Sequence, residues 1–137
     1  MNSINKIEQG RAEAAFKAVK RRTMDENAKK ENYKSYSKKI PMLIKTNGLA
    51  ATFAFINTNE KDDASVLLGR DIIEWLVVLN PEINQYLENN GNKLDDFINY
   101  LLSIPMITYR LITREILAYM NWHRRFTEGM IKVQQNG

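Results

Sequence analysis

The residue types that can do acid–base chemistry are sparse in this chain of 137 residues. Its one histidine, His123, lies within a helical pattern, with Arg124 beside it and no further ligand at metal-binding spacing. General-base catalysis by histidine needs an oriented partner, which the residues around His123 do not provide. We therefore expect His123 to be a structural histidine, at the surface or half-buried, and not a catalytic one.

Carboxylate pairs and glycine turns are the other places where chemistry could occur. Asp62–Asp63 and Asp95–Asp96 lie at the starts of expected helices, where capping and the helix dipole explain them. The chain has no cysteine, which excludes thiolate metal sites and a cysteine nucleophile. Neither glycine turn has the spacing of a phosphate-binding loop. The sequence therefore predicts no catalytic residue, no metal ligand and no cofactor.

Basic side chains, in contrast, are spaced so that they could bind a polyanion. At 100° per residue, one narrow arc of a long C-terminal helix contains Arg110, Arg114, Asn121, Arg125 and Lys132, with Arg124 at its edge. A stripe of an earlier helix contains Lys34, Lys38 and Lys45, with Lys39 to one side. Like charges at this spacing weaken a helix slightly, and an RNA backbone would offset that cost through counterion release. A solvated face is the alternative, and periodicity alone leaves both open.

The net charge of +4 is unevenly distributed along the chain. Residues 60–104 carry three basic and nine acidic side chains, whereas residues 29–59 carry six basic and one acidic. This asymmetry suggests one surface for a polyanion and another for a protein neighbour. Chance scatter over a solvated surface is the alternative explanation.

Helical periodicity dominates the chain and must position these side chains. We expect a first helix from about residue 4 and a loop over 23–32. Further helices are expected over 31–47, 49–57 and from Asp62 or Asp63 to Leu79, one or two shorter ones within 82–104, broken at 89–93, and a last one over 106–133. The prediction is an all-α fold, with residues 1–137 forming a single-domain bundle of five to seven helices with a long C-terminal helix.

Two helices raise specific packing expectations. Arg11 lies among the apolar positions of the first helix, so its guanidinium needs a carboxylate or backbone carbonyls, or must reach past the neighbouring alanines. We favour a structural role for Arg11, because buried charges are normally paired. The helix over 49–57 is apolar almost all round, which predicts a central place in the core. Gly48 is expected to end the helix before it.

Three segments resemble one known family. They are QGRAEAAFKAV at Gln9–Val19, YSKKIPMLIKTNGLAATFAFI at Tyr36–Ile56 and YRLITREILAYMNWHRRFTEGMI at Tyr109–Ile131. Together they resemble the small α-helical subunit of the type III-B CRISPR RNA-guided effector complex, the Cmr small-subunit family. The resemblance covers about two fifths of the chain, and residues 60–104 carry no matching signature. His123 and Thr127 depart from the family's usual residue types.

The resemblance implies a non-catalytic structural subunit in antiviral defence. Its partners would be the backbone subunits of the Cmr complex, further copies of itself stacked head to tail, and the guide and target RNA, with no small-molecule substrate. The basic positions within the matching segments, together with Lys34 on the same stripe, are the expected RNA-binding residues: Lys34, Lys38, Lys39, Lys45, Arg110, Arg114, Arg124 and Arg125. The alternative is a purely protein-binding helical spacer with no direct RNA contact.

The expected location is the cytoplasm. The longest clean apolar runs, such as Trp75–Leu79, fall far short of the roughly 20 residues that a membrane-spanning helix needs. The first ten residues lack the apolar core of a signal peptide. We therefore expect neither export nor a membrane partner.

Overall fold

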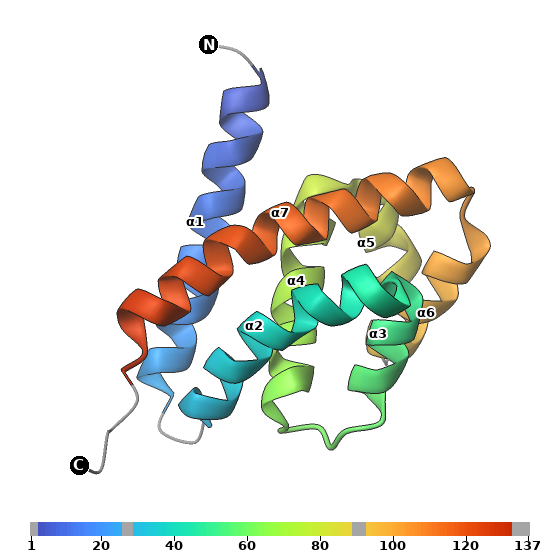
Figure 1. Ribbon diagram of the computed structural model, residues 1–137. Helices are drawn as coiled ribbons and strands as arrows, with labels where there is room; N and C mark the ends of the chain where they lie inside the picture. The colour runs from blue at the N-terminus through green and yellow to red at the C-terminus, as the bar shows by residue number, and fades with distance from the viewer. Residues whose placement is uncertain (1–2, 26–28, 89–92, 133–137) are drawn as a thin grey trace.

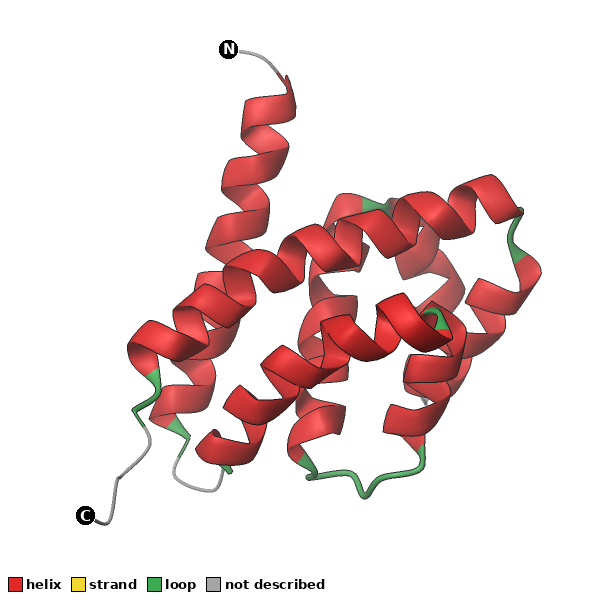
Figure 2. Cartoon of the chain, in the orientation of Figure 1, coloured by secondary structure: helices red, strands yellow, loops and turns green. Residues whose placement is uncertain are grey.

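The computed structural model describes residues 3–25, 29–88 and 93–132, and within these residues the chain forms helices and no strand (Figures 1 and 2). The helices of the described part are α1 (Ser3–Met24), α2 (Lys30–Asn47), α3 (Leu49–Asn57), α4 (Ala64–Leu79), α5 (Pro81–Glu88), α6 (Lys93–Ser103) and α7 (Met106–Met130). The predicted all-α bundle with a long C-terminal helix is confirmed. The break expected at 89–93 falls largely on residues outside the described part.

Local signals explain where most helices begin and end. Gly48 has φ 91°, a backbone conformation that favours glycine, and its N–H donates to the Ile44 carbonyl at 2.9 Å, which ends α2. The carboxylate of Asp63 accepts the Ser65 N–H at 2.9 Å and caps α4. These expected boundaries are therefore confirmed.

The end of α7 differs from the prediction. The helix stops at Met130, so residues 131 and 132 lie beyond it. The chain becomes extended at Ile131, whose side chain is buried, and the ammonium of Lys34 donates to the Ile131 carbonyl at 2.9 Å. The helix ends before the predicted residue 133 because the Ile131 side chain is buried and its carbonyl accepts a hydrogen bond from Lys34.

The helices pack around α4, which contacts α1, α2, α3, α5 and α6. On the side facing the viewer in Figure 1, α7 lies across α1 and beside α2. Helices α3, α5 and α6 lie together at the end of the bundle that is farther from α1. The core contains fully buried rings from several helices. Phe53 of α3 and Phe97 of α6, for example, pack edge to face with their centroids 4.9 Å apart.

The expectation that residues 49–57 are central to the core is wrong for half of the helix. Leu49, Phe53 and Ile56 are buried, but the opposite side of α3 faces outward, and Phe55 remains 47% exposed. A nine-residue helix packed against α2, α4 and α6 can bury only the face that meets these neighbours. The small alanines on the other face leave little apolar surface to cover.

None of the described helices is both long enough and apolar enough to cross a bilayer.

Candidate nucleic-acid interface

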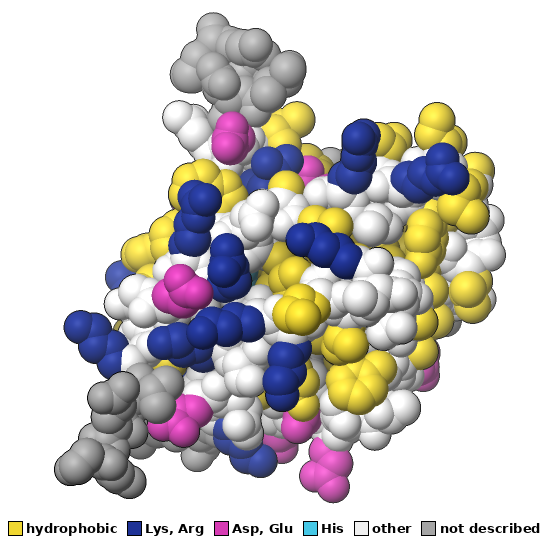
Figure 3. Space-filling model, viewed as in Figure 1, with side chains coloured by type: hydrophobic (Ala, Val, Ile, Leu, Met, Phe, Trp, Pro, Cys, Tyr) yellow, Lys and Arg dark blue, Asp and Glu magenta, His cyan; other side chains and the backbone are white. Residues whose placement is uncertain are grey.

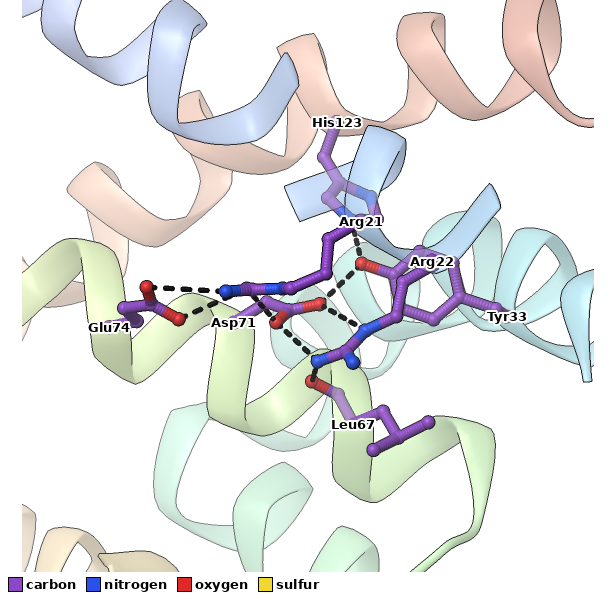
Figure 4. A network of polar contacts seen from close by, with 7 residues as sticks. All are labelled: Arg21, Arg22, Tyr33, Leu67, Asp71, Glu74 and His123. Carbon is purple, nitrogen blue, oxygen red and sulfur yellow. Dashed lines mark hydrogen bonds and ion pairs between the residues drawn. The ribbon is translucent and has the colours of Figure 1, made fainter. Parts of the chain in front are cut away.

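A buried carboxylate joins three helices in the interior of the bundle. Asp71 of α4 is 3% exposed and accepts hydrogen bonds from both arginines at the end of α1 (Figure 4). Arg22 donates to it through two nitrogens at 2.6 and 3.1 Å, and Arg21 through one at 2.8 Å. The hydroxyl of Tyr33, from α2, donates to the same carboxylate at 2.6 Å. Each oxygen of Asp71 is therefore satisfied, and α1, α2 and α4 are tied together at one point.

Opposing effects act on the ionisation of Asp71. Burial raises the pKa of Asp71, whereas the hydrogen bonds and charge of Arg22 act in the opposite direction. Arg21 also binds Glu74 at 3.0 Å, and that contact raises the pKa of Arg21. A carboxylate held by two guanidinium groups is a structural element. Removal of the carboxylate or of the guanidinium groups would leave a buried charge uncompensated.

His123 extends this network into α7. Its Nε2 lies 2.7 Å from the Tyr33 hydroxyl and its Nδ1 lies 2.7 Å from the Ser37 hydroxyl. Because the single Tyr33 proton goes to Asp71, the Nε2 must carry its own proton and donate to Tyr33. The Nδ1 then accepts from Ser37, which makes the imidazole neutral.

The expectation of a surface or half-buried His123 is therefore wrong. The side chain is fully buried, because α1 and α2 cover this face of α7. Burial, with the nearby Arg22 charge adding to it, lowers the pKa of His123 to about 3. Its hydrogen-bonded surroundings support the structural role that the sequence indicated.

A second polar contact fastens α1 to α7. The guanidinium of Arg11 binds both carboxylate oxygens of Glu115, at 2.6 and 2.8 Å. The indole N–H of Trp75 donates to the same carboxylate at 3.0 Å. The expectation that Arg11 has a structural role and a paired charge is confirmed.

Contacts with α7 set the direction of α2. The contacts follow opposite orders along the two segments, so that α2 and α7 run antiparallel: Lys34 with Ile131 just beyond α7, Ser37 with His123, and the N–H of Ala50, just beyond α2 in α3, with the Tyr109 hydroxyl. The residues next to these contacts, including Lys38 beside Ser37 and Arg124 beside His123, are consequently held on two fixed neighbouring helices.

Most of the expected RNA-binding side chains lie on the surface of these two helices. Figure 3 shows Lys and Arg side chains spread over α7 and α2 on the face that also points forward in Figure 1. Seven of the eight expected residues are exposed: Lys38, Lys39, Lys45, Arg110, Arg114, Arg124 and Arg125. Lys34 is half-buried, with its ammonium bound to the Ile131 carbonyl. We call Lys38, Lys39, Lys45, Arg124 and Arg125 the basic face.

The cations differ in their local contacts. Within the described residues, Lys38 and Lys45 have no carboxylate at ion-pair distance. The ion pair that Arg124 forms in the described part of the chain is a long, exposed contact of 3.9 Å with Glu128, which contributes little. Arg125 lies over the Trp122 ring and Lys39 over the Tyr36 ring, at 5.7 and 5.6 Å from the ring centroids. These charges are thus available to an anion, with their positions set by the packed helices.

Several carboxylates of the acidic segment 60–104 are engaged in contacts within the protein. Asp63 caps α4, Asp71 is buried, and Glu74 is bound by Arg21. Sequence reasoning missed the network around Asp71. Two signals could have indicated it: a single aspartate inside an apolar helix, and an adjacent pair of arginines at the end of another.

In the described part of the chain, no three histidine or carboxylate side chains lie close enough together to hold a metal ion.

The helical bundle and the basic face define a small all-helical protein that offers a rigid, positively charged surface. The model of the CRISPR-associated protein family Cas_Cmr5 matches residues 7–130, and the chain belongs to this family. A relative from Thermus thermophilus, described as CRISPR system Cmr subunit Cmr5, is 24% identical over 121 residues, which cover 88% of this chain and 92% of the relative. The family resemblance seen in the sequence is confirmed.

A solved structure supports the same fold. The crystal structure of a CRISPR-associated Cmr5 family protein from Thermus thermophilus superimposes with a TM-score of 0.72. The match covers 92% of this chain and 97% of that chain, at 24% sequence identity. The helical arrangement described above is therefore that of a Cmr5 family protein.

Proposed function

We propose that this protein is a non-catalytic structural subunit of a type III-B CRISPR (Cmr) effector complex in the cytoplasm. Copies of it stack as a filament along the channel for guide and target RNA, beside the backbone subunits. The basic face contacts the RNA backbone there. The observation that carries the proposal is the family match over residues 7–130, together with exposed cations on two neighbouring helices.

The chemistry of the basic face suits a phosphate backbone better than bases. Lys38 and Lys45 are point charges on one helix, and Arg124 and Arg125 add guanidinium groups from the other. Phosphate contacts position a nucleic acid without reading its sequence, and a guide–target duplex is recognised through its backbone and shape. A subunit that meets any guide sequence requires contacts of this kind.

The aromatic side chains near the basic face support the same conclusion. Trp122 and Phe126 stack on each other with centroids 5.9 Å apart, and Phe126 packs edge to face on Phe16 of α1 at 5.4 Å. Both Trp122 and Phe126 are partly buried against the core. They fill the α1–α7 contact, so base stacking has no part in the proposed mode of binding.

Crosslinking in the assembled complex tests the proposal. A photoreactive group placed at Lys45 or Arg125 should crosslink to RNA when guide and target are bound. The same group at Lys61, an exposed cation between α3 and α4, is the matched control and should give no RNA product. Crosslinks from Lys45 and Arg125 only to protein would contradict RNA contact.

A protein-binding spacer is the second candidate, because large apolar side chains are exposed at the start of α7. In that case the basic face would meet acidic surfaces of neighbouring subunits. The two candidates differ in the crosslinking experiment, since a spacer without RNA contact gives only protein products at the basic face.

A further inference from the structure

The start of α7 and the end of α6 expose a cluster of large apolar side chains. Those of Leu102, Met106, Ile107 and Leu111 are between 58% and 72% exposed. The other exposed large apolar residues of the described chain, such as Met24 and Val78, belong to helices other than α6 and α7. A cluster of this kind on a small protein marks an interaction site more often than single exposed side chains do.

The same turns of α7 form an open groove of about 660 Å³. Its lining combines the apolar Met106, Ile107 and Leu111 with the guanidinium groups of Arg110 and Arg114. Among the described residues, neither arginine has a carboxylate at ion-pair distance. At this end of α7, on the right of Figure 3, yellow side chains lie next to dark-blue ones.

We propose that this apolar–basic groove docks a segment of a different protein subunit, one that presents apolar side chains together with Asp or Glu. The inference rests on the proposed function as a subunit of an assembly. It assigns Arg110 and Arg114 to a protein contact and leaves the basic face to the RNA backbone.

The apolar side chains distinguish a protein from RNA as the occupant. A phosphate backbone would engage Arg110 and Arg114 but would leave Ile107 and Leu111 in water or against charged groups. A protein segment covers both kinds of side chain, because its apolar residues fill the groove and its carboxylates reach the guanidinium groups. The basic face, by comparison, has its cations distributed along two helices, and its helix α2 exposes one large apolar side chain, Met42, where the start of α7 exposes three.

Charge also argues against several surfaces of a second copy of this chain as the occupant. Met42 is exposed on α2 one turn from both Lys38 and Lys45, and Phe16 has the Lys20 ammonium 5.9 Å from its ring centroid. Docking either surface onto the groove would bring lysines toward Arg110. Near the exposed Val78, the closest carboxylate in the helix, Glu74, is already bound by Arg21.

A photocrosslinker at Ile107 identifies the occupant directly. We would incorporate p-benzoylphenylalanine there in the complete chain, assemble the effector complex with RNA, and sequence the crosslinked product. The expected product is a peptide of another subunit with apolar residues and at least one Asp or Glu. A product with RNA, a product with a second copy, or the absence of any product would overturn the inference. Val78, equally exposed at 72%, is the matched control position.

Variants measure what the groove contributes to assembly. The double substitution Ile107→Asn and Leu111→Asn should lower incorporation into the complex by about tenfold, as for the centre of a protein interface. Val78→Asn should leave incorporation unchanged, and circular-dichroism melting confirms that each variant is folded. If the double variant entered the complex as well as the wild type does, the inference about the groove would be overturned, and the proposed function would be unaffected. Failure of the wild-type chain to enter the complex would instead overturn the proposed function.

Discussion

Lowering the pH should destabilise this protein through His123. In the folded state burial lowers the pKa of His123 to about 3, against an ordinary value of 6.5. Between these two values the unfolded chain binds a proton that the folded chain does not, so the free energy of unfolding falls as the pH falls. With respect to His123, the free energy of unfolding therefore has its full value above about pH 6.5 and decreases progressively below that pH.

The size of the effect follows from the two pKa values. One pKa unit corresponds to about 1.4 kcal/mol, so a change from pH 7 to pH 5 should lower the free energy of unfolding by about 2 kcal/mol through His123 alone. Asp71 acts in the opposite direction, since its raised pKa makes the folded state bind its proton more readily. A comparison between two proteins that both keep Asp71 removes this contribution.

The assay is urea unfolding, followed by circular dichroism between about pH 4.5 and 7.5, for the wild type and His123→Gln. The glutamine amide can form hydrogen bonds with its neighbours but does not titrate in this range. The wild type should lose about 2 kcal/mol more than the variant between pH 7 and pH 5. Parallel stability curves for the two proteins would refute the conclusion that His123 is buried in its neutral form.

Further substitutions test the other contacts by urea unfolding at pH 7. Asp71→Ala should cost about 3–5 kcal/mol, because it leaves Arg22 uncompensated, and a cost below about 1 kcal/mol would argue against the buried network. Glu115→Ala removes the acceptor of Arg11 and should cost about 1–3 kcal/mol; unchanged stability would show that this contact is dispensable. Gly48→Ala should cost about 1–3 kcal/mol, owing to its positive φ, whereas Gly129→Ala, with no heavy atom within 4 Å of the added methyl group, serves as its control.

The parts of the fold that depend on local sequence could be predicted. Gly48 and Asp63 act on their own helix ends, through a backbone conformation and a capping hydrogen bond that involve only near neighbours. The pairing of Arg11 could be anticipated because a guanidinium on an apolar helix face needs an acceptor. Its partner, Glu115, could not be named, since it lies 104 residues further along the chain.

The parts that depend on tertiary packing could not be read from the pattern. His123 is buried because α1 and α2 cover its face of α7, and periodicity does not reveal which helices meet. Phe55 is exposed because the described helices pack against α3 on one side only. For the basic face, helical spacing indicated the stripes on each helix, but their antiparallel placement depends on contacts such as Ser37 with His123.

Salt dependence of target-RNA binding is the most direct test of the proposed RNA contact. Complexes assembled with the wild type, with Lys38→Glu and Lys45→Glu together, or with Lys61→Glu and Arg70→Glu together would be compared at matched incorporation. Reversing the charges of Lys38 and Lys45 should weaken RNA binding at low salt. It should also reduce the slope of log K against log salt concentration by about 2 for each copy that contacts the RNA, because each lost phosphate contact lowers the slope by about 1. The control pair, exposed cations of the same total charge, should leave affinity and slope unchanged. Equal slopes for all three complexes would contradict contact between the basic face and the RNA backbone.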